Sequence, residues 1–153
     1  MPTCRLVIGQ KNGRFLTTGG LGTMGYSLPA AVGVKTALPD RQTVVVCGDG
    51  SFQMEMNELA AVRCAGHDIK IVLFRNRTLG LVHQIQTMAP YHGPFGVSLD
   101  GSPDFAAIAA AYGIPTLTLS DEERLSGTLD EFLQTSGPCL LLCEVDPDVK
   151  TTD

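Results

Sequence analysis

The sequence predicts a three-layer α/β/α domain built on a mostly parallel β-sheet. Short apolar runs rich in β-branched or aliphatic residues recur at 43–47 (TVVVC), 69–74 (IKIVLF) and 139–145 (CLLLCEV). Segments with helical spacing separate these runs, and a helical crossover between two strands makes them parallel. The nearly continuous apolar character of the runs is typical of strands buried on both faces. A chain of 153 residues is enough for one domain with a proper core, and we find neither an internal repeat nor a second domain.

The composition narrows the class of protein. Hydrophobic residues make up 44% of the chain, the formal net charge is −5, and no basic run suits nucleic acid. No apolar stretch is long enough to span a bilayer, and no signal-peptide pattern is present. We therefore expect a cytoplasmic protein with neither a nucleic-acid nor a membrane partner. The five cysteines lack C-x-x-C spacing, which favours buried, reduced thiols over a zinc site.

A strand, a glycine loop and a helix are expected before the first long strand. Residues 15–18 are predicted as a short strand leading into 19–25 (GGLGTMG). Four glycines in seven residues indicate backbone conformations closed to other residues, or close approach of a ligand. Ser27 is expected to cap a helix that runs through Val34.

Two further helices and a long loop are expected in the middle of the chain. Apolar residues at helical spacing predict a helix from Phe52 that stops at Gly66. A second helix is predicted over 79–88. Residues 89–102, rich in glycine and proline, are expected to form a long surface loop, and such loops often serve as functional lids.

The last third is expected to contain a helix, a strand and a helix before the final strand. Ser102, Pro103 and Asp104 give the first helix a cap, a proline at the first position and an acid in the first turn. A strand follows at 115–119, and the second helix starts at Asp121. The expected inward-facing residues are Phe105, Ile108, Ala109 and Tyr112 in the first helix, and Leu125, Leu129, Phe132 and Leu133 in the second.

Polar residues follow the first two long strands. Asp49 follows the first strand and Asn76 the second. Because the carboxyl ends of parallel strands meet at one edge of a sheet, these side chains are expected to converge, and their oxygens suit Mg²⁺ or Ca²⁺. Gly50 and Ser51 lie where the intervening helix begins, and free N–H groups at a helix start favour a phosphate. The pattern therefore predicts a metal-bridged diphosphate.

The glycine loop also allows a different interpretation. Gly20, Gly22 and Gly25 match the dinucleotide fingerprint G-x-G-x-x-G. That fingerprint needs a strong strand before it and an acidic residue about 20 positions later that binds a ribose hydroxyl. Here Asp49 is followed by glycine and a helix start, which suits phosphate or metal better. A non-catalytic dinucleotide-binding module is kept as an alternative.

Read together, these motifs resemble the thiamine diphosphate-dependent enzymes. Gly48-Asp49-Gly50 followed by Asn76, 27 residues after Asp49, looks like the thiamine diphosphate-binding signature. Four stretches are similar to the acetolactate synthase family: 20–33 (GLGTMGYSLPAAVG), 48–54 (GDGSFQM), 79–86 (LGLVHQIQ) and 102–105 (SPDF). The likeness extends from Phe15 to Pro147, and it implies the fold of the C-terminal, diphosphate-binding domain of that family.

The resemblance also implies a set of ligands. Mg²⁺ would be bound by Asp49, the side-chain oxygen of Asn76 and the backbone carbonyl of Thr78. The Met24 side chain would hold the cofactor bent. The whole cofactor-binding set that the resemblance implies is Gly22, Thr23, Met24, Gly48, Asp49, Gly50, Ser51, Asn76, Leu79 and Gly80.

The function that the resemblance implies belongs to a larger enzyme. An acetolactate synthase-like enzyme decarboxylates a 2-oxo acid such as pyruvate and joins the product to a second 2-oxo acid. In the family the activating glutamate lies on a separate pyrimidine-binding domain, so we expect no catalytic residue in 1–153 and no activity from this chain alone. The chain is expected to be a fragment or split subunit of a homo-oligomer, which could hold FAD outside this domain. A subunit of another thiamine diphosphate-dependent 2-oxo acid decarboxylase or acyltransferase is the alternative.

Three positions depart from the family pattern. His83 stands where an arginine is common, and a solvated helix histidine is favoured there over one that touches substrate. Arg75 stands where the family usually has a second asparagine, which leaves the shape of the turn open. Ile85 stands where synthases that favour branched-chain precursors usually carry tryptophan, which leaves the acceptor open.

Overall fold

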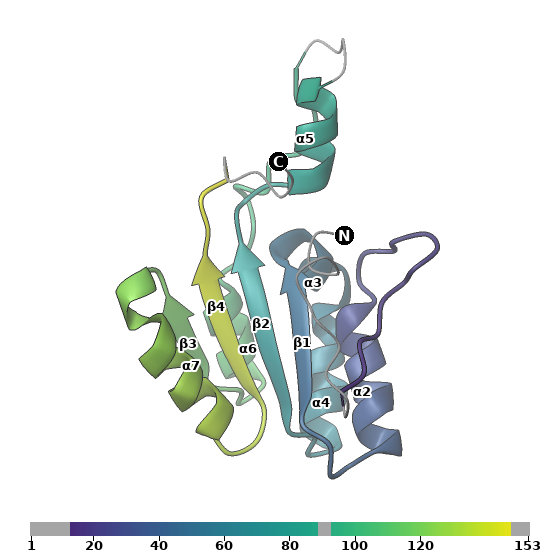
Figure 1. The fold of residues 1–153 in the computed structure, drawn as a ribbon, viewed down its shortest axis with the longest axis vertical. Helices are drawn as coiled ribbons and strands as arrows, with labels where there is room; N and C mark the ends of the chain where they lie inside the picture. The colour runs from purple at the N-terminus through teal and green to yellow at the C-terminus, as the bar shows by residue number, and fades with distance from the viewer. Residues whose placement is uncertain (1–12, 89–92, 148–153) are drawn as a thin grey trace.

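A computed structural model describes residues 13–88 and 93–147. Its centre is a 4-stranded, all-parallel sheet in the order β1-β2-β4-β3. The strands are β1 (Thr43–Gly48), β2 (Ile69–Arg75), β3 (Thr116–Leu119) and β4 (Cys139–Glu144). The last of the described strands, β4, therefore lies between β2 and β3 (Figure 1).

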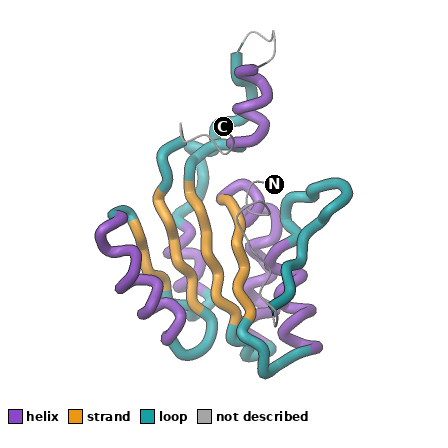
Figure 2. The backbone as a smooth tube through the Cα atoms, viewed as in Figure 1, coloured by secondary structure: helices purple, strands orange, loops and turns teal. Residues whose placement is uncertain are grey.

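Helices cover both faces of this sheet, which confirms the three-layer α/β/α fold. They are α2 (Ser27–Ala37), α3 (Asp49–Glu55), α4 (Leu59–Cys64), α5 (Gly80–Met88), α6 (Phe105–Ala111) and α7 (Leu125–Gln134), with 3₁₀ turns η1 (Met56–Glu58) and η2 (Glu122–Arg124). Helices α2, α3, α4 and α6 lie behind the sheet in Figure 1, and α7 lies in front of β3 and β4. Helix α5 projects beyond the carboxyl ends of the strands and buries none of its residues. Figure 2 shows the same path with the loops that join these layers.

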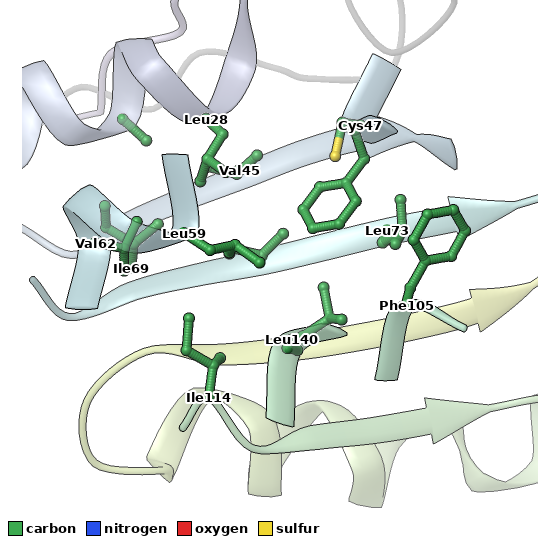
Figure 3. Close-up of a cluster of buried hydrophobic side chains, with 14 of the residues drawn as sticks. Leu28, Val45, Cys47, Leu59, Val62, Ile69, Leu73, Phe105, Ile114 and Leu140 are labelled. Carbon is green, nitrogen blue, oxygen red and sulfur yellow. The ribbon is translucent and has the colours of Figure 1, made fainter. Parts of the chain in front are cut away.

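The main core lies between the sheet and the four helices behind it (Figure 3). Phe105 of α6 is fully buried and meets Phe52 of α3 edge to face, with ring centroids 5.7 Å apart. A smaller cluster under α7 centres on Phe132 and Leu141. Each cluster removes apolar surface from water on one side of the sheet, which is the main favourable contribution to folding.

Strand β1 is buried on one face only. Val45 and Cys47 point into the main core, whereas Val44 and Val46 are 46% and 38% exposed. Among the described elements α7 covers the front of β3 and β4 and does not reach β1. The expectation that this strand is buried on both faces was therefore wrong.

Several expectations about helix and strand starts were also wrong. Residues 15–18 form no strand. Ser27 is the first residue of α2 and does not cap it, since its hydroxyl points to the Val46 carbonyl at 3.5 Å. The helix expected from Phe52 starts earlier and is interrupted by η1. Its last residue is Cys64, and Gly66, whose φ of +64° suits glycine, follows as the expected stop.

Asp104, and not Ser102, caps α6. The Asp104 carboxylate accepts a hydrogen bond from the Ala107 N–H at 3.0 Å. The Ser102 hydroxyl is instead engaged at the loop, where it donates to the Leu99 carbonyl at 2.6 Å and accepts from Gln53 at 2.8 Å. A serine with two other partners is not available as a helix cap.

Helix α7 turns only part of the expected face inward, since Phe132 and Leu129 pack on the sheet and Leu125 and Leu133 do not. Phe132 and Thr128 are buried, whereas Leu125 and Leu133 are each 44% exposed. Leu125 is the first residue of the helix, and Leu133 lies about 100° around the helix axis from Phe132. Neither side chain therefore reaches the sheet, and the prediction for these two residues was wrong.

The described cysteines are free, and three of the four are buried, as expected. Burial raises the pKa of the Cys47 thiol to about 12, and the nearby Asp49 adds to the rise. Burial also raises the pKa of Cys139 and of Cys143. Cys64 is exposed, and Cys4 lies outside the described residues.

Thiol labelling is therefore expected to separate Cys64 from the buried cysteines. The thiolate is the reactive form, and a raised pKa keeps Cys47 protonated at mildly alkaline pH. Changing Cys64 to serine should remove one fast-reacting thiol from the native chain, as counted with an aromatic disulfide reagent. Changing Cys47 to serine should lower the count only after denaturation. Fast native labelling that is lost in the Cys47 variant would contradict the burial of this thiol.

Candidate functional site

The parallel register of β1 and β2 brings Asp49 and Asn76 to one edge of the sheet. Gly48 pairs with Phe74, so the residues that follow emerge side by side at the carboxyl ends of the strands. Asp49 begins α3 and is 1% exposed. Its Oδ1 accepts a hydrogen bond from the Gly50 N–H at 2.9 Å, and its Oδ2 accepts one from the Arg77 N–H at 2.8 Å.

The turn after β2 is fixed by a short antiparallel contact. Thr78 forms an isolated bridge with Ser98. The Thr78 hydroxyl and the Leu79 N–H both donate to the Val97 carbonyl, at 3.2 and 2.9 Å. The Asn76 side-chain oxygen accepts from the Thr78 N–H at 3.2 Å. These contacts hold 76–79 against the edge of the sheet.

The loop after α5 contributes residues that the sequence analysis missed. Val97 is buried, and Leu99 donates its N–H to the Arg77 carbonyl at 2.8 Å. The expectation of a surface loop was therefore wrong for this segment. The alternation of apolar and polar residues over 97–100 (VSLD) was the available signal.

Three segments converge around Gly50. A Cβ built on Gly50 would lie 2.7 Å from the Leu79 Cδ2, 3.1 Å from the Met24 Cε and 3.2 Å from the Leu99 Cδ1. The Gly25 N–H donates to the Ser51 hydroxyl at 2.9 Å, which ties the glycine loop to the start of α3. These three side chains close over Gly50 and leave no room for a Cβ there.

The structure places the predicted site residues in two groups. Those that lie together at the carboxyl edge are Met24, Asp49, Gly50, Ser51, Asn76, Thr78, Leu79 and Gly80. Gly22 and Thr23 lie on the exposed glycine loop, and Gly48 is exposed at the end of β1. A Cβ built on Gly22 would meet nothing within 4 Å, so its φ of +64° and not crowding explains glycine there. At Gly80 a built Cβ would lie 3.0 Å from the Asn76 Nδ2.

Asp49 is a buried acid that pairs with no cationic side chain in the part of the chain that the structure describes. Burial raises the pKa of its carboxyl, and the backbone N–H bonds from Arg77 and Gly50 act in the opposite direction. None of the ion pairs among the described residues includes Asp49. A buried carboxylate without a counter-charge is costly, so this position suits a bound cation.

The donor set at this edge favours a hard cation. The described residues contain no cluster of three or more His, Cys, Asp or Glu that could hold a metal ion. A carboxylate, a carboxamide oxygen and backbone carbonyls are the oxygen donors that Mg²⁺ takes, usually together with waters and phosphate oxygens. Asp49 and the turn from Asn76 to Thr78 supply that kind of donor.

Most of the chain matches one known protein family. The family model for the thiamine pyrophosphate enzyme C-terminal TPP-binding domain matches residues 1–143. The chain belongs to this family. Its four parallel strands and flanking helices are the α/β/α fold of a TPP-binding domain.

Known acetolactate synthases are similar to this TPP-binding domain over most of its length. It is 40% identical over 137 residues to the large subunit of acetolactate synthase isozyme 1 from Escherichia coli K12. The aligned region covers 90% of this chain and 24% of that protein. It is 41% identical over 135 residues to the mitochondrial acetolactate synthase catalytic subunit of Saccharomyces cerevisiae, covering 88% of this chain and 20% of that protein. The TPP-binding domain thus spans a quarter or less of these relatives.

The described helices give no sign of a membrane span, since none is both long enough and apolar enough to cross a bilayer.

Proposed function

We propose that this chain is the Mg²⁺- and thiamine diphosphate-binding domain of an acetolactate synthase-like enzyme. The observation that carries the proposal is Asp49, a buried carboxylate with no ion-pair partner among the described residues. It lies beside Gly50, where the glycine loop and the turn after β2 meet. Family membership and acetolactate synthase relatives support the cofactor.

The residues at the carboxyl edge have distinct roles in this proposal. Asp49, the Asn76 side-chain oxygen and the Thr78 carbonyl would bind Mg²⁺, which would also contact the diphosphate. Gly50, Ser51, Leu79 and Gly80 would supply backbone N–H groups. The N–H groups of Gly50 and Leu79 already have acceptors in Asp49 and Val97, so they would have to exchange or share these bonds.

The glycine loop would contact the organic part of the cofactor. Gly22, Thr23 and Met24 would lie against the aminopyrimidine, with the Met24 side chain as the wedge that keeps the cofactor bent. The Met24 Cε lies 3.1 Å from the Cβ position of Gly50, beside Asp49, which supports this placement. The chemistry that the bound cofactor supplies is an electron sink for the decarboxylation of a 2-oxo acid.

The activity belongs to a larger assembly in this proposal. Residues 1–153 would form one domain, and the activating glutamate would come from a pyrimidine-binding domain of the same protein or of a partner subunit. The whole cytoplasmic homo-oligomer would decarboxylate a 2-oxo acid such as pyruvate and join the product to a second 2-oxo acid. FAD, if the enzyme holds it, would bind outside this domain. The span of a quarter or less of the acetolactate synthase relatives supports this division.

Calorimetric titration tests the cofactor assignment. The whole protein that carries this domain should bind thiamine diphosphate saturably in the presence of Mg²⁺ and much more weakly when the metal is chelated. Formation of an acetohydroxy acid from pyruvate would then support the synthase assignment, and release of an aldehyde alone would favour a decarboxylase. Binding of NAD that does not depend on Mg²⁺ would contradict the proposal.

The substitution Gly50→Ala, which adds a methyl group, is expected to weaken the binding of thiamine diphosphate by about tenfold. The added Cβ would lie 2.7 Å from Leu79 and 3.1 Å from Met24, so both residues must shift, and both belong to the proposed cofactor-binding set. Gly127 in α7 is a matched control, because a Cβ there meets nothing within 4 Å. Gly127→Ala should leave the dissociation constant unchanged. Equal affinities for the two variants would show that Gly50 does not border the cofactor.

A further inference from the structure

One carboxylate joins two arginines beside the proposed metal site. Glu144 ends β4 and pairs in register with Arg75 of β2. Its Oε1 lies 3.0 Å from the Arg75 Nη1, and its Oε2 lies 3.3 Å from the Arg77 Nη2. Both oxygens of one side chain therefore hold arginines that flank Asn76.

The backbone at Arg77 has an unusual conformation. Its φ of +58° is the only positive value at a non-glycine residue in the described part of the chain. A side chain with a Cβ disfavours this left-handed region, so the surrounding contacts must hold it there. The Arg77 N–H in this conformation donates to the Asp49 Oδ2 at 2.8 Å. The conformation of Arg77 therefore bears directly on the orientation of the Asp49 carboxylate.

The pair between Glu144 and Arg75 differs from an ordinary surface ion pair. The two side chains are 27% and 26% exposed, and the Arg75 Nε is buried without a partner among the described residues. Glu144 is thus the acceptor on which the Arg75 guanidinium depends. The Arg77 arm is more open, at 53% exposure. The two ion pairs of Glu144, with Arg75 and with Arg77, together anchor both sides of the Asn76 turn to β4.

We propose that Glu144 is a positioning residue for the metal-binding turn. By holding Arg75 and Arg77 it keeps the left-handed backbone at Arg77, and this backbone orients Asp49 and places the Asn76 and Thr78 oxygens. The role toward Mg²⁺ rests on the proposed function, whereas the role toward the turn stands on the contacts alone. The ion pair with Glu144 also explains how a chain with arginine at position 75 keeps the conformation of this turn.

Amide hydrogen exchange tests the effect on the turn without any cofactor. In Glu144→Gln the exchange rate of the Arg77 N–H, followed by NMR in the full chain, should rise by about threefold to tenfold. The amide of Ile71, in the middle of β2, should keep its rate and so report that the fold is intact. Glu122→Gln, an exposed carboxylate in η2, is the matched control and should change neither rate. An unchanged Arg77 rate in Glu144→Gln would overturn the proposal.

A pair of substitutions at Arg77 separates the backbone role from the loss of charge. Arg77→Ala and Arg77→Gly both remove the contact with Glu144, but only glycine adopts the left-handed conformation easily. The dissociation constant of thiamine diphosphate with Mg²⁺, measured on the whole protein, should rise about fivefold in the alanine variant and less in the glycine variant. Equal losses in the two variants would contradict a role through the backbone.

The two proposals fail in different ways. If the wild-type protein binds no thiamine diphosphate with Mg²⁺ but Glu144→Gln still speeds exchange at Arg77, the cofactor assignment is wrong and the anchoring of the turn stands. If binding occurs and exchange does not respond, the cofactor assignment stands and Glu144 has no positioning role.

Discussion

Changing Asp49 to asparagine is expected to weaken the Mg²⁺-dependent binding of thiamine diphosphate by about a hundredfold or more. Loss of a residue that only supports a metal ligand typically costs 10- to 100-fold in affinity, and Asp49 is proposed as a ligand itself. It is also the only carboxylate proposed there, so the substitution removes the charge that opposes the cation. Calorimetric titration of the whole protein with the cofactor at fixed Mg²⁺ measures the change.

The Asp49 variant is expected to stay folded. Burial raises the pKa of this carboxyl, so without a cation the ionised form costs stability as the pH rises above the unfolded-state pKa. Asparagine removes that cost, although its amide group can no longer accept both backbone N–H bonds. Asp130→Asn, at an exposed position in α7, is the control and should bind normally. Unchanged affinity in a folded Asp49 variant would show that the metal is bound elsewhere.

Changing Phe105 to alanine is expected to lower the free energy of unfolding by about 3–5 kcal/mol. Phe105 is fully buried, and its ring packs edge to face on Phe52 at 5.7 Å between the centroids. The substitution leaves a cavity between α6, α3 and the sheet, where neighbouring side chains relax only in part. Urea denaturation followed by circular dichroism measures the loss.

Phe95 offers a matched control for this substitution. Its side chain is 87% exposed, so removal of the ring changes the buried apolar area very little. The alanine variant should therefore stay within about 0.5 kcal/mol of wild type. If both variants lost the same stability, α6 would not pack as described.

The strands of the sheet could be predicted from the sequence because their signal is local, whereas the strand predicted at 15–18 does not form. The runs at 43–47 and 69–74 each extend one residue further in the structure, and β4 ends one residue before the predicted end. The helix caps were harder to predict, since neighbouring polar residues compete. Ser102 and Asp104 can each cap a helix, and the contacts of Ser102 with Leu99 and Gln53 decide in favour of Asp104.

In the candidate site, too, some contacts follow from neighbouring elements of the sequence and others depend on the order of the strands. Asp49 and Asn76 could be expected at one edge because a crossover helix fixes the direction of both strands. The contact of Glu144 with Arg75 could not, because it requires β4 to lie next to β2. Strand order depends on packing across the whole sheet, and the spacing of residues in the sequence does not predict it.

The order of the strands has a consequence for synthesis on the ribosome. Strand β3 pairs with β4 and with no other described strand, and β4 is the last of the described strands to be made. Until residues 139–144 have left the exit tunnel, β3 has no neighbouring strand and one edge of β2 stays unpaired. The nascent domain therefore cannot complete its sheet gradually from the amino end. A chaperone that shields the growing chain would have to remain until the final strand inserts.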